Sequence, residues 1–290
     1  MLDLAQADPA TSIPVLHAIV LGITQGLSEF LPISSSGHLI LVPWLFGWEE
    51  LTGPANVDLN KTFDVALHVG TIVASIVYFR RDLARLAGAG LTSIRRQAVR
   101  TTDERLAWLL VVSAVPGAIV GAVLESAIND YLGEIWLIAI MLIVFGVVLA
   151  VADRLPSNLE EGDYGPRQAV IMGLAQAGAL SPGVSRSGIT ITAGRFLGFD
   201  RNAAARLSFL MSMPITGGAA LYKGLGLAVD GLPPGTAPAF LWGIVASAVT
   251  GLAAVWLVLK VVRTRSFLPF VVYRVLAGLA VLALLASPLR

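Results

Sequence analysis

The chain has 290 residues, of which 56% are hydrophobic and 13% are charged, and its mean hydropathy is +0.79. A soluble globule of this size needs more charged residues to cover its surface, so the composition excludes that class and indicates a polytopic membrane protein. The basic residues behind the net charge of +1 are spread among loops, which argues against nucleic-acid binding. The absence of cysteine excludes disulfides, thiolate metal sites and a cysteine nucleophile.

The first apolar segment, residues 14–47, is interrupted from Pro32 to Gly37. Proline ends a helix and glycine frees the backbone, so we expect a loop between two short helices. Before the loop, Gln25 and Glu29 are four residues apart and share one helix face. A carboxylate in so apolar a run is costly unless it faces protein or trapped water, which makes Glu29 a candidate functional residue.

Six further runs are long enough to cross a bilayer, which takes about 20 apolar residues. They are 62–79, 106–125, 133–152, 203–222, 239–260 and 268–286. Between the third and the fourth lies a second broken segment, 167–199, interrupted at 181–188. We interpret both broken segments as re-entrant helical hairpins, each entering and leaving the membrane on one side.

The two interruptions resemble each other in sequence. GITQGLSEFLPISSSG (22–37) aligns without a gap with GLAQAGALSPGVSRSG (173–188). Each half then holds one hairpin and three spans, in pseudo-repeats 14–153 and 167–288 of a single membrane domain, 1–290. Because three is odd, the second half inserts upside down. The expected fold class is an all-α integral membrane protein, with six transmembrane helices and two re-entrant hairpins in an inverted-topology repeat. Chance similarity of segments rich in Gly, Ser and Ala is the alternative.

Basic residues predict the orientation of the chain in the membrane. If the first span runs inward, fifteen Lys and Arg side chains face the cytoplasm and three face outside. Both termini are then outside, and 80–105 is a cytoplasmic loop. The first hairpin dips in from outside and the second rises from the cytoplasm to meet it. Arg186 and Arg274 stay in the membrane region, and the sequence identifies no partner for Arg274.

The second loop places Arg186 between two serines. A buried guanidinium flanked by hydroxyls is typical of an oxyanion clamp, and both loops lead into a short helix whose free N–H groups favour an anion. We therefore predict a phosphate or pyrophosphate site. Its candidate binding residues are Gln25, Ser34, Ser36, Ser185, Ser187 and Thr190. The alternative is that Arg186 serves only as the counter-ion of Glu29.

Glu29, Ser35 and His38 supply groups that binding alone does not need. A carboxylate and an imidazole can exchange a proton while a serine hydroxyl or the imidazole attacks phosphorus. Ser35 is our first choice of nucleophile, a phosphohistidine on His38 is the main alternative, and direct attack by water is a third. Glu29, assisted by Gln25, is also a candidate ligand for a divalent cation, Mg or Ca. For His68 we favour a packed or backbone-bonded role.

Two long motifs surround the interruptions, QGLSEFLPISSSGH (25–38) and PGVSRSGITI (182–191), supported by FDVALHVGT (63–71) and YR (273–274). They resemble the undecaprenyl-diphosphate phosphatase family associated with bacitracin resistance. The resemblance implies hydrolysis of undecaprenyl diphosphate to undecaprenyl phosphate and inorganic phosphate. This reaction recycles the lipid carrier for cell-wall synthesis at the bacterial cytoplasmic (inner) membrane.

The resemblance carries the family's functional residues to Glu29, Ser35, His38 and Arg186. Many members have a second glutamate where this chain has Gln25, which weakens a two-carboxylate metal site, although members are reported to respond to divalent cations. No organic cofactor is expected. A transporter or flippase of a lipid phosphate or anion is the alternative function, since the same inverted repeat suits it. The oligomeric state stays open, with a homodimer as one candidate.

Overall fold

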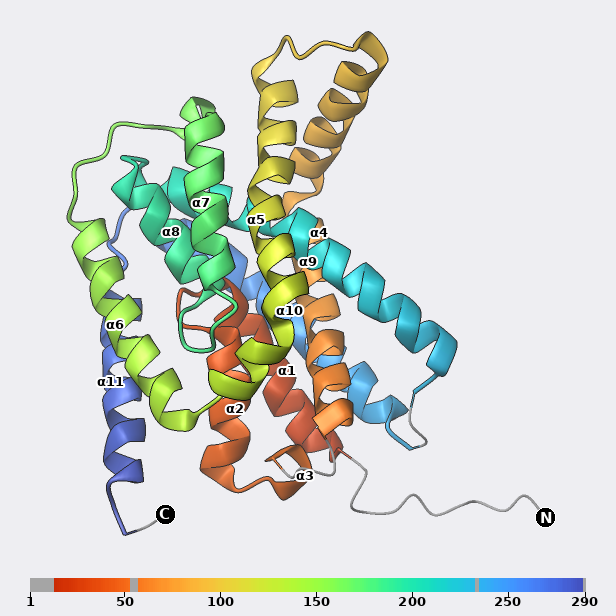
Figure 1. Cartoon of the computed structure of the whole chain (residues 1–290), viewed down its shortest axis with the longest axis vertical. Coiled ribbons are helices and arrows are strands. Elements are labelled where there is room, and N and C mark those ends of the chain that lie inside the picture. The colour runs from red at the N-terminus through yellow and green to blue at the C-terminus, as the bar shows by residue number, and fades with distance from the viewer. Residues whose placement is uncertain (1–12, 53–56, 233–234, 289–290) are drawn as a thin grey trace.

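The computed structural model describes residues 13–52, 57–232 and 235–288, with side chains for all of these except 58, 124–131 and 221–230. Within these ranges the chain is helical, with one isolated bridge and no strand, as predicted (Figure 1). The helices are α1 (Val15–Phe30), α2 (Ser35–Phe46), α3 (Glu49–Thr52), α4 (Val57–Arg96), α5 (Thr102–Tyr131), α6 (Ile135–Asp153), the 3-10 helix η3 (Glu161–Asp163), α7 (Pro166–Gly178), α8 (Arg186–Phe196), α9 (Arg201–Asp230), α10 (Ala237–Val261) and α11 (Leu268–Leu285).

Five helices in the described ranges are long and apolar enough to cross a membrane, namely α4, α5, α6, α10 and α11. Several such helices in one chain indicate a multi-pass membrane protein. The predicted spans 133–152, 239–260 and 268–286 agree with α6, α10 and α11 to within two residues at each end. The predicted span 203–222 falls in α9 and runs into residues whose side chains lie outside the described part of the chain.

The prediction of a loop over 80–105 is wrong. α4 continues to Arg96 beyond a kink at Phe79 (φ −93°, ψ 16°), so only a few residues separate it from α5. A reciprocal cap starts α5, because Thr101 Oγ1 accepts the Glu104 N–H (3.2 Å) while Glu104 Oε2 accepts the Thr101 N–H (3.1 Å). The result is a helical hairpin that projects from one end of the molecule, opposite the end of α11 (Figure 1). Hydropathy marks only the apolar part of such a helix, which is why its solvated extension was missed.

Glycines bring the short helices against the long ones. α1 packs along α10, where a methyl group at Gly22 would lie 2.3 Å from the carbonyl oxygen of Gly243. α7 packs along α5, where a methyl group at Gly173 would lie 2.6 Å from the carbonyl oxygen of Ser113. Small residues let helix backbones touch in this way inside membranes. The positions of α1 and α7 are therefore fixed by backbone contact.

Four short helices bring two loops to the middle of the molecule. α1, α2, α7 and α8 have 16, 12, 13 and 11 residues, fewer than the about 20 that cross a bilayer. The chain turns back between α1 and α2 and again between α7 and α8, and the two turns lie together near the centre of Figure 1. Residues far apart in sequence meet there.

Candidate active site

The two central loops end with the same backbone turn. Ser34 (φ 79°, ψ 95°) and Ser185 (φ 76°, ψ 117°) both have a positive φ, which is uncommon for a residue other than glycine. Each serine hydroxyl accepts the N–H of the glycine three residues later, Gly37 (3.3 Å) or Gly188 (3.1 Å), and so caps a helix. Such strained turns persist where the surroundings enforce them, often at functional sites. Here they set the starting points of α2 and α8.

The loops also bond directly to each other. The backbone N–H of Gly183 donates to Ser34 Oγ (3.0 Å), and Ser187 Oγ donates to the carbonyl oxygen of Leu31 (3.2 Å). Both bonds join residues about 150 positions apart in the chain, with separations of 149 and 156. Ser34 and Ser187 therefore hold the two loops together, a role that differs from the phosphate binding predicted for them.

Arg274 on α11 has the partner that the sequence could not identify, and that partner is backbone. Its side chain is fully buried, and among the described residues it makes no ion pair. Gly188 sits against it, since a methyl group there would lie 2.8 Å from Arg274 Nη1. The guanidinium instead donates to carbonyl oxygens of both loops and of α6, within 2.8 to 3.3 Å: Pro32, Met141, Leu142, Gly183 and Val184.

Glu29 lies at the centre of the site and is 6% exposed. Its Oε1 accepts from Arg186 Nη2 (2.5 Å), and its Oε2 accepts from Ser35 Oγ (2.6 Å). Ser35 and Arg186 are the first residues of α2 and α8, so both capped turns deliver a side chain to this one carboxylate. A hydroxyl and a permanent cation thus both lie within hydrogen-bonding distance of one acid, and all three residues were predicted from the sequence.

Two more side chains surround the carboxylate. Gln25 Nε2 donates to Glu29 Oε2 (3.2 Å), as expected for residues four apart on α1. His68 of α4 points Nε2 toward the same oxygen at 3.9 Å, while its Nδ1 lies 2.8 Å from the carbonyl oxygen of Asp64. The backbone bond agrees with the role predicted for His68. No feature of the sequence indicates that the ring also faces the acid.

His38 contacts groups other than Glu29. Its Nδ1 lies 2.7 Å from the carbonyl oxygen of Ser34, and its Nε2 lies 2.7 Å from the hydroxyl of Tyr273, on which the ring also stacks. A carbonyl oxygen only accepts, so we assign the proton to Nδ1 and an accepting role to Nε2. Glu29 and His38 therefore make their hydrogen bonds to different groups.

The remaining predicted phosphate ligands divide into two kinds. Thr190 is fully buried, and its hydroxyl lies 2.7 Å from the Arg186 carbonyl oxygen and 2.6 Å from Ser208 Oγ. Ser185 is committed to its cap and lies 3.3 Å from Ser187 Oγ. Ser36 is half-buried and its hydroxyl makes no hydrogen bond with the described residues. Of these candidate side chains, Ser36 and the remaining N–H groups of Arg186 have no hydrogen-bond partner in the described part of the chain, so they are open to a ligand.

A known family matches most of the chain. The family model described as Bacitracin resistance protein BacA matches residues 18–280, which include both loops. This chain belongs to the BacA family.

Curated relatives match nearly the whole of this BacA-family chain. A protein of Geobacter sulfurreducens named undecaprenyl-diphosphatase is 50% identical over 273 residues, which is 93% of this chain and 98% of the relative. One of Pelobacter propionicus with the same name is 48% identical, over 94% and 98%. A more distant one, of a Nocardioides species, is 42% identical, over 94% and 97%.

The side chains of this BacA-family site supply only some of the ligands that a metal ion needs. Among the described residues, no three His, Asp or Glu side chains are grouped closely enough to hold a metal. Glu29 and the amide oxygen of Gln25, which is buried and has no hydrogen-bond partner among the described residues, offer the oxygen ligands that Mg and Ca prefer. A cation there needs the oxygens of a bound diphosphate to complete its coordination, as is usual for Mg.

Sequence reasoning missed three residues of the site in this BacA-family chain. His68 on α4 lies near the acid, Arg274 on α11 contacts both loops, and Tyr273 on α11 contacts His38 of α2. The segments FDVALHVGT and YR already carried part of the family resemblance. The family resemblance therefore indicated these segments, but it did not indicate which residues they contact.

Proposed function

We propose that this chain hydrolyses undecaprenyl diphosphate to undecaprenyl phosphate and inorganic phosphate. Membership of the BacA family and relatives named undecaprenyl-diphosphatase support this activity. The observation that carries the proposal is that Glu29 forms hydrogen bonds with both Ser35 and Arg186. The activity recycles the lipid carrier used in cell-wall synthesis and so confers bacitracin resistance.

The diphosphate binds between the starts of α2 and α8. Arg186 uses only Nη2 toward Glu29, and its other N–H groups have no partner among the described residues, so they are available to phosphate oxygens. The free N–H groups at the two helix starts and the Ser36 hydroxyl add further donors. Donors held in place by capped turns stabilise the charge that develops in the transition state.

Ser35 is the nucleophile in our proposal. Its Oγ attacks the terminal phosphorus while its proton passes to Glu29 Oε2, 2.6 Å away. The bond from that phosphorus to the bridging oxygen breaks, and undecaprenyl phosphate leaves, taking the proton back from Glu29. Water activated by Glu29 then cleaves the phosphoserine, which releases inorganic phosphate and restores the hydroxyl.

The geometry favours Ser35 over His38 as the attacking group. His38 Nε2 accepts from Tyr273 and its Nδ1 is bonded to Ser34, so neither nitrogen can attack until one of these bonds breaks. We assign His38 the second proton-handling role, with Tyr273 fixing the orientation of the ring.

A divalent cation held by Glu29 and the Gln25 amide oxygen is part of the proposal. When bound together with diphosphate oxygens, it would neutralise phosphate charge. Gln25 presents a buried oxygen without a partner, and this supports the assignment.

We also propose the membrane arrangement that the sequence predicts, with six spans and two re-entrant hairpins in an inverted repeat within a single domain. The matching turns at Ser34 and Ser185 support it, as does the exchange of partners in which α1 packs on α10 and α7 packs on α5. Both termini lie outside in this arrangement, and the diphosphate is cut in a cavity that opens outward at the bacterial inner membrane. The lipid tail lies between spans and faces the bilayer.

Two measurements on detergent-purified protein test the activity and the nucleophile. Phosphate release from undecaprenyl diphosphate must proceed without an ion gradient, which a transporter would need. Rapid quenching followed by mass spectrometry must then locate a phosphoryl group on Ser35. A phosphoryl group on His38 would replace Ser35 as nucleophile, and an unmodified enzyme during turnover would favour direct attack by water.

A further inference from the structure

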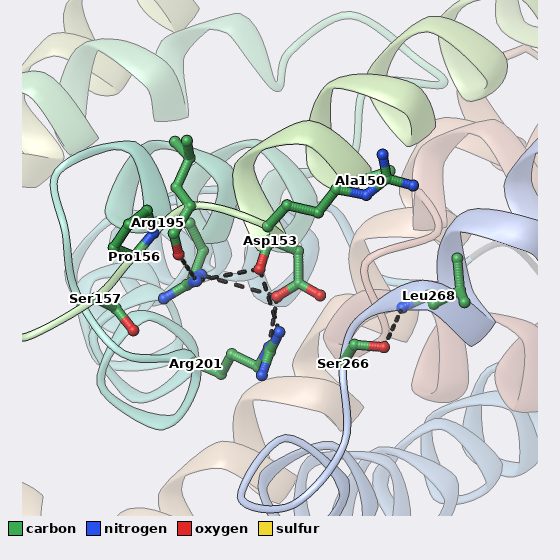
Figure 2. Close-up of a pocket in the computed structure, with 10 residues that line it drawn as sticks. Ala150, Asp153, Pro156, Ser157, Arg195, Arg201, Ser266 and Leu268 are labelled. Atoms are coloured by element: carbon green, nitrogen blue, oxygen red, sulfur yellow. Dashed lines mark hydrogen bonds and ion pairs between the residues drawn. The ribbon is translucent and has the colours of Figure 1, made fainter.

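A cavity of about 400 Å³ lies away from the proposed active site, where α6 and α8 end and α9 and α11 begin. Figure 2 shows Asp153, Arg195 and Arg201 gathered at its centre, with Ser157 and Ser266 at its sides. In Figure 1 these helix ends lie on the side of the molecule from which the α4–α5 hairpin projects. Its volume is within the range that holds small ligands.

Positive charge dominates the lining of this cavity. Arg154, Arg195 and Arg201 contribute three guanidinium groups, and Asp153 is the one carboxylate in the lining. The excess charge is therefore two positive units. A guanidinium is permanently charged and matches phosphate oxygens with paired donors, so the lining favours an anion that carries phosphate.

The carboxylate of Asp153 is already bonded to other groups of the protein. Asp153 Oδ1 accepts from Arg201 Nε (2.6 Å), and Oδ2 accepts the backbone N–H of Phe267 (3.0 Å). Asp153 thereby fixes the start of α11 and orients Arg201. Because Asp153 is the one carboxylate in the lining, the cavity keeps an excess of positive charge.

Several donors in the cavity are unused. Arg195 is 2% exposed, and its Nε has no hydrogen-bond partner within the described ranges, although it lies 3.8 Å from Asp153 Oδ1 in an ion pair. Its Nη atoms bond to the carbonyl oxygens of Asp153, Leu155 and Phe199. Arg154 is exposed and, among the described residues, forms no ion pair. The exposed Ser157 hydroxyl makes no hydrogen bond there either.

We propose that this cavity binds the phosphate group of an anionic membrane lipid. In the proposed orientation this end of the molecule lies at the cytoplasmic leaflet, where anionic lipids attract basic groups and where basic pockets between helices hold their head groups. Leu155 and Leu268, 37% and 53% exposed, line the cavity and give the acyl chains an apolar surface. α8 connects the two sites, because it begins with Arg186 and carries Arg195 at its other end.

The experiment measures the melting temperature of purified protein in detergent during titration with a short-chain phosphatidylglycerol, phosphatidylcholine or inorganic phosphate. The test variant is Arg154→Gln, which removes a cavity charge that makes no ion pair within the described ranges. The matched control is Arg263→Gln, an exposed arginine on the α10–α11 connection outside the cavity. Phosphatidylglycerol should stabilise the protein more than phosphatidylcholine does, and Arg154→Gln should weaken its apparent affinity about fivefold, as expected for one arginine near a lipid surface.

Three outcomes would overturn the proposal. Equal stabilisation by inorganic phosphate, weakened by Arg154→Gln and unchanged by Arg263→Gln, would identify the free ion as the ligand of the cavity and reject the lipid. Equal weakening in both variants would show a diffuse effect of charge with no role for the cavity. If phosphatidylglycerol did not raise the melting temperature, the cavity would not bind an anionic lipid. None of these results depends on the phosphatase activity, so failure here is distinguishable from failure of the proposed function.

Discussion

Glu29 shows at the scale of one residue how the two loops are joined. Its two carboxylate oxygens contact groups from different helices, Arg186 through Oε1 and both Ser35 and Gln25 through Oε2. A carboxylate that only neutralised Arg186 would not need the Ser35 contact. Activation of Ser35 is the property that separates a catalytic acid from a structural counter-ion.

Glu29→Gln should lower kcat for phosphate release by about 10² to 10⁴, the usual contribution of a general base. The amide keeps the shape of the side chain but cannot take the Ser35 proton. Glu134→Gln makes the same chemical change at an exposed residue before α6 and should leave kcat unaltered. If Glu29→Gln kept full turnover, Glu29 would be reduced to the counter-ion of Arg186.

Gln25→Glu should lower the concentration of Mg or Ca that gives half-maximal activity. The change places a second carboxylate four residues from Glu29 on the same face of α1, and hard cations bind more tightly where ligand charge is higher. A titration of activity against each cation measures the effect, with Gln25→Ala as the comparison. An identical cation dependence in Gln25→Glu and the unchanged protein would remove Gln25 from the proposed cation site.

At the scale of the helices, close backbone packing holds α1 and therefore Glu29. Gly22→Ala would place a methyl group 2.3 Å from the Gly243 carbonyl oxygen on α10, so α1 must move. We expect a loss of about 1 to 3 kcal/mol in the free energy of unfolding, the usual cost of overpacking, together with reduced kcat.

Gly218→Ala on α9 is the matched control for Gly22→Ala, since nothing lies within 4 Å of the added methyl group. It should be neutral or slightly stabilising in the same thermal-unfolding measurement, because alanine favours a helix. If both alanine substitutions changed stability equally, the contact between α1 and α10 would not limit the size of the side chain at position 22.

Arg274 connects α6, α11 and both loops, so its loss belongs to the same scale. Arg274→Met should cost about 3 kcal/mol or more, because several buried carbonyl oxygens lose their donor at once. Arg263→Met, at an exposed position, provides the control in thermal unfolding. An unchanged melting temperature for Arg274→Met would show that the loops are held without it.

At the scale of the whole molecule, the proposed orientation can be tested directly because the chain has no cysteine. Single cysteines at Glu134 and Thr264, both exposed, should lie on opposite sides of the membrane. A membrane-impermeant thiol reagent applied to intact cells should label Glu134→Cys, and it should label Thr264→Cys only after lysis. The reverse pattern would place the termini in the cytoplasm.

The parts of the molecule that the sequence predicts well are those with a local physical signal. Apolar runs located α6, α10 and α11 closely, and the polar interruptions located Glu29, Ser35 and Arg186. Contacts between distant residues have no such signal. Tyr273 lies 235 positions from His38, and the partners of Arg274 are backbone oxygens that every residue carries.

Ser35 and Arg186 occupy the same place in two copies of one turn, each directly after a serine with positive φ. The repeated geometry presents one neutral hydroxyl and one cation to Glu29. The same turn therefore holds two side chains of different chemistry in place. Neither half of the chain, expressed alone, would contain Glu29, Ser35 and Arg186 together.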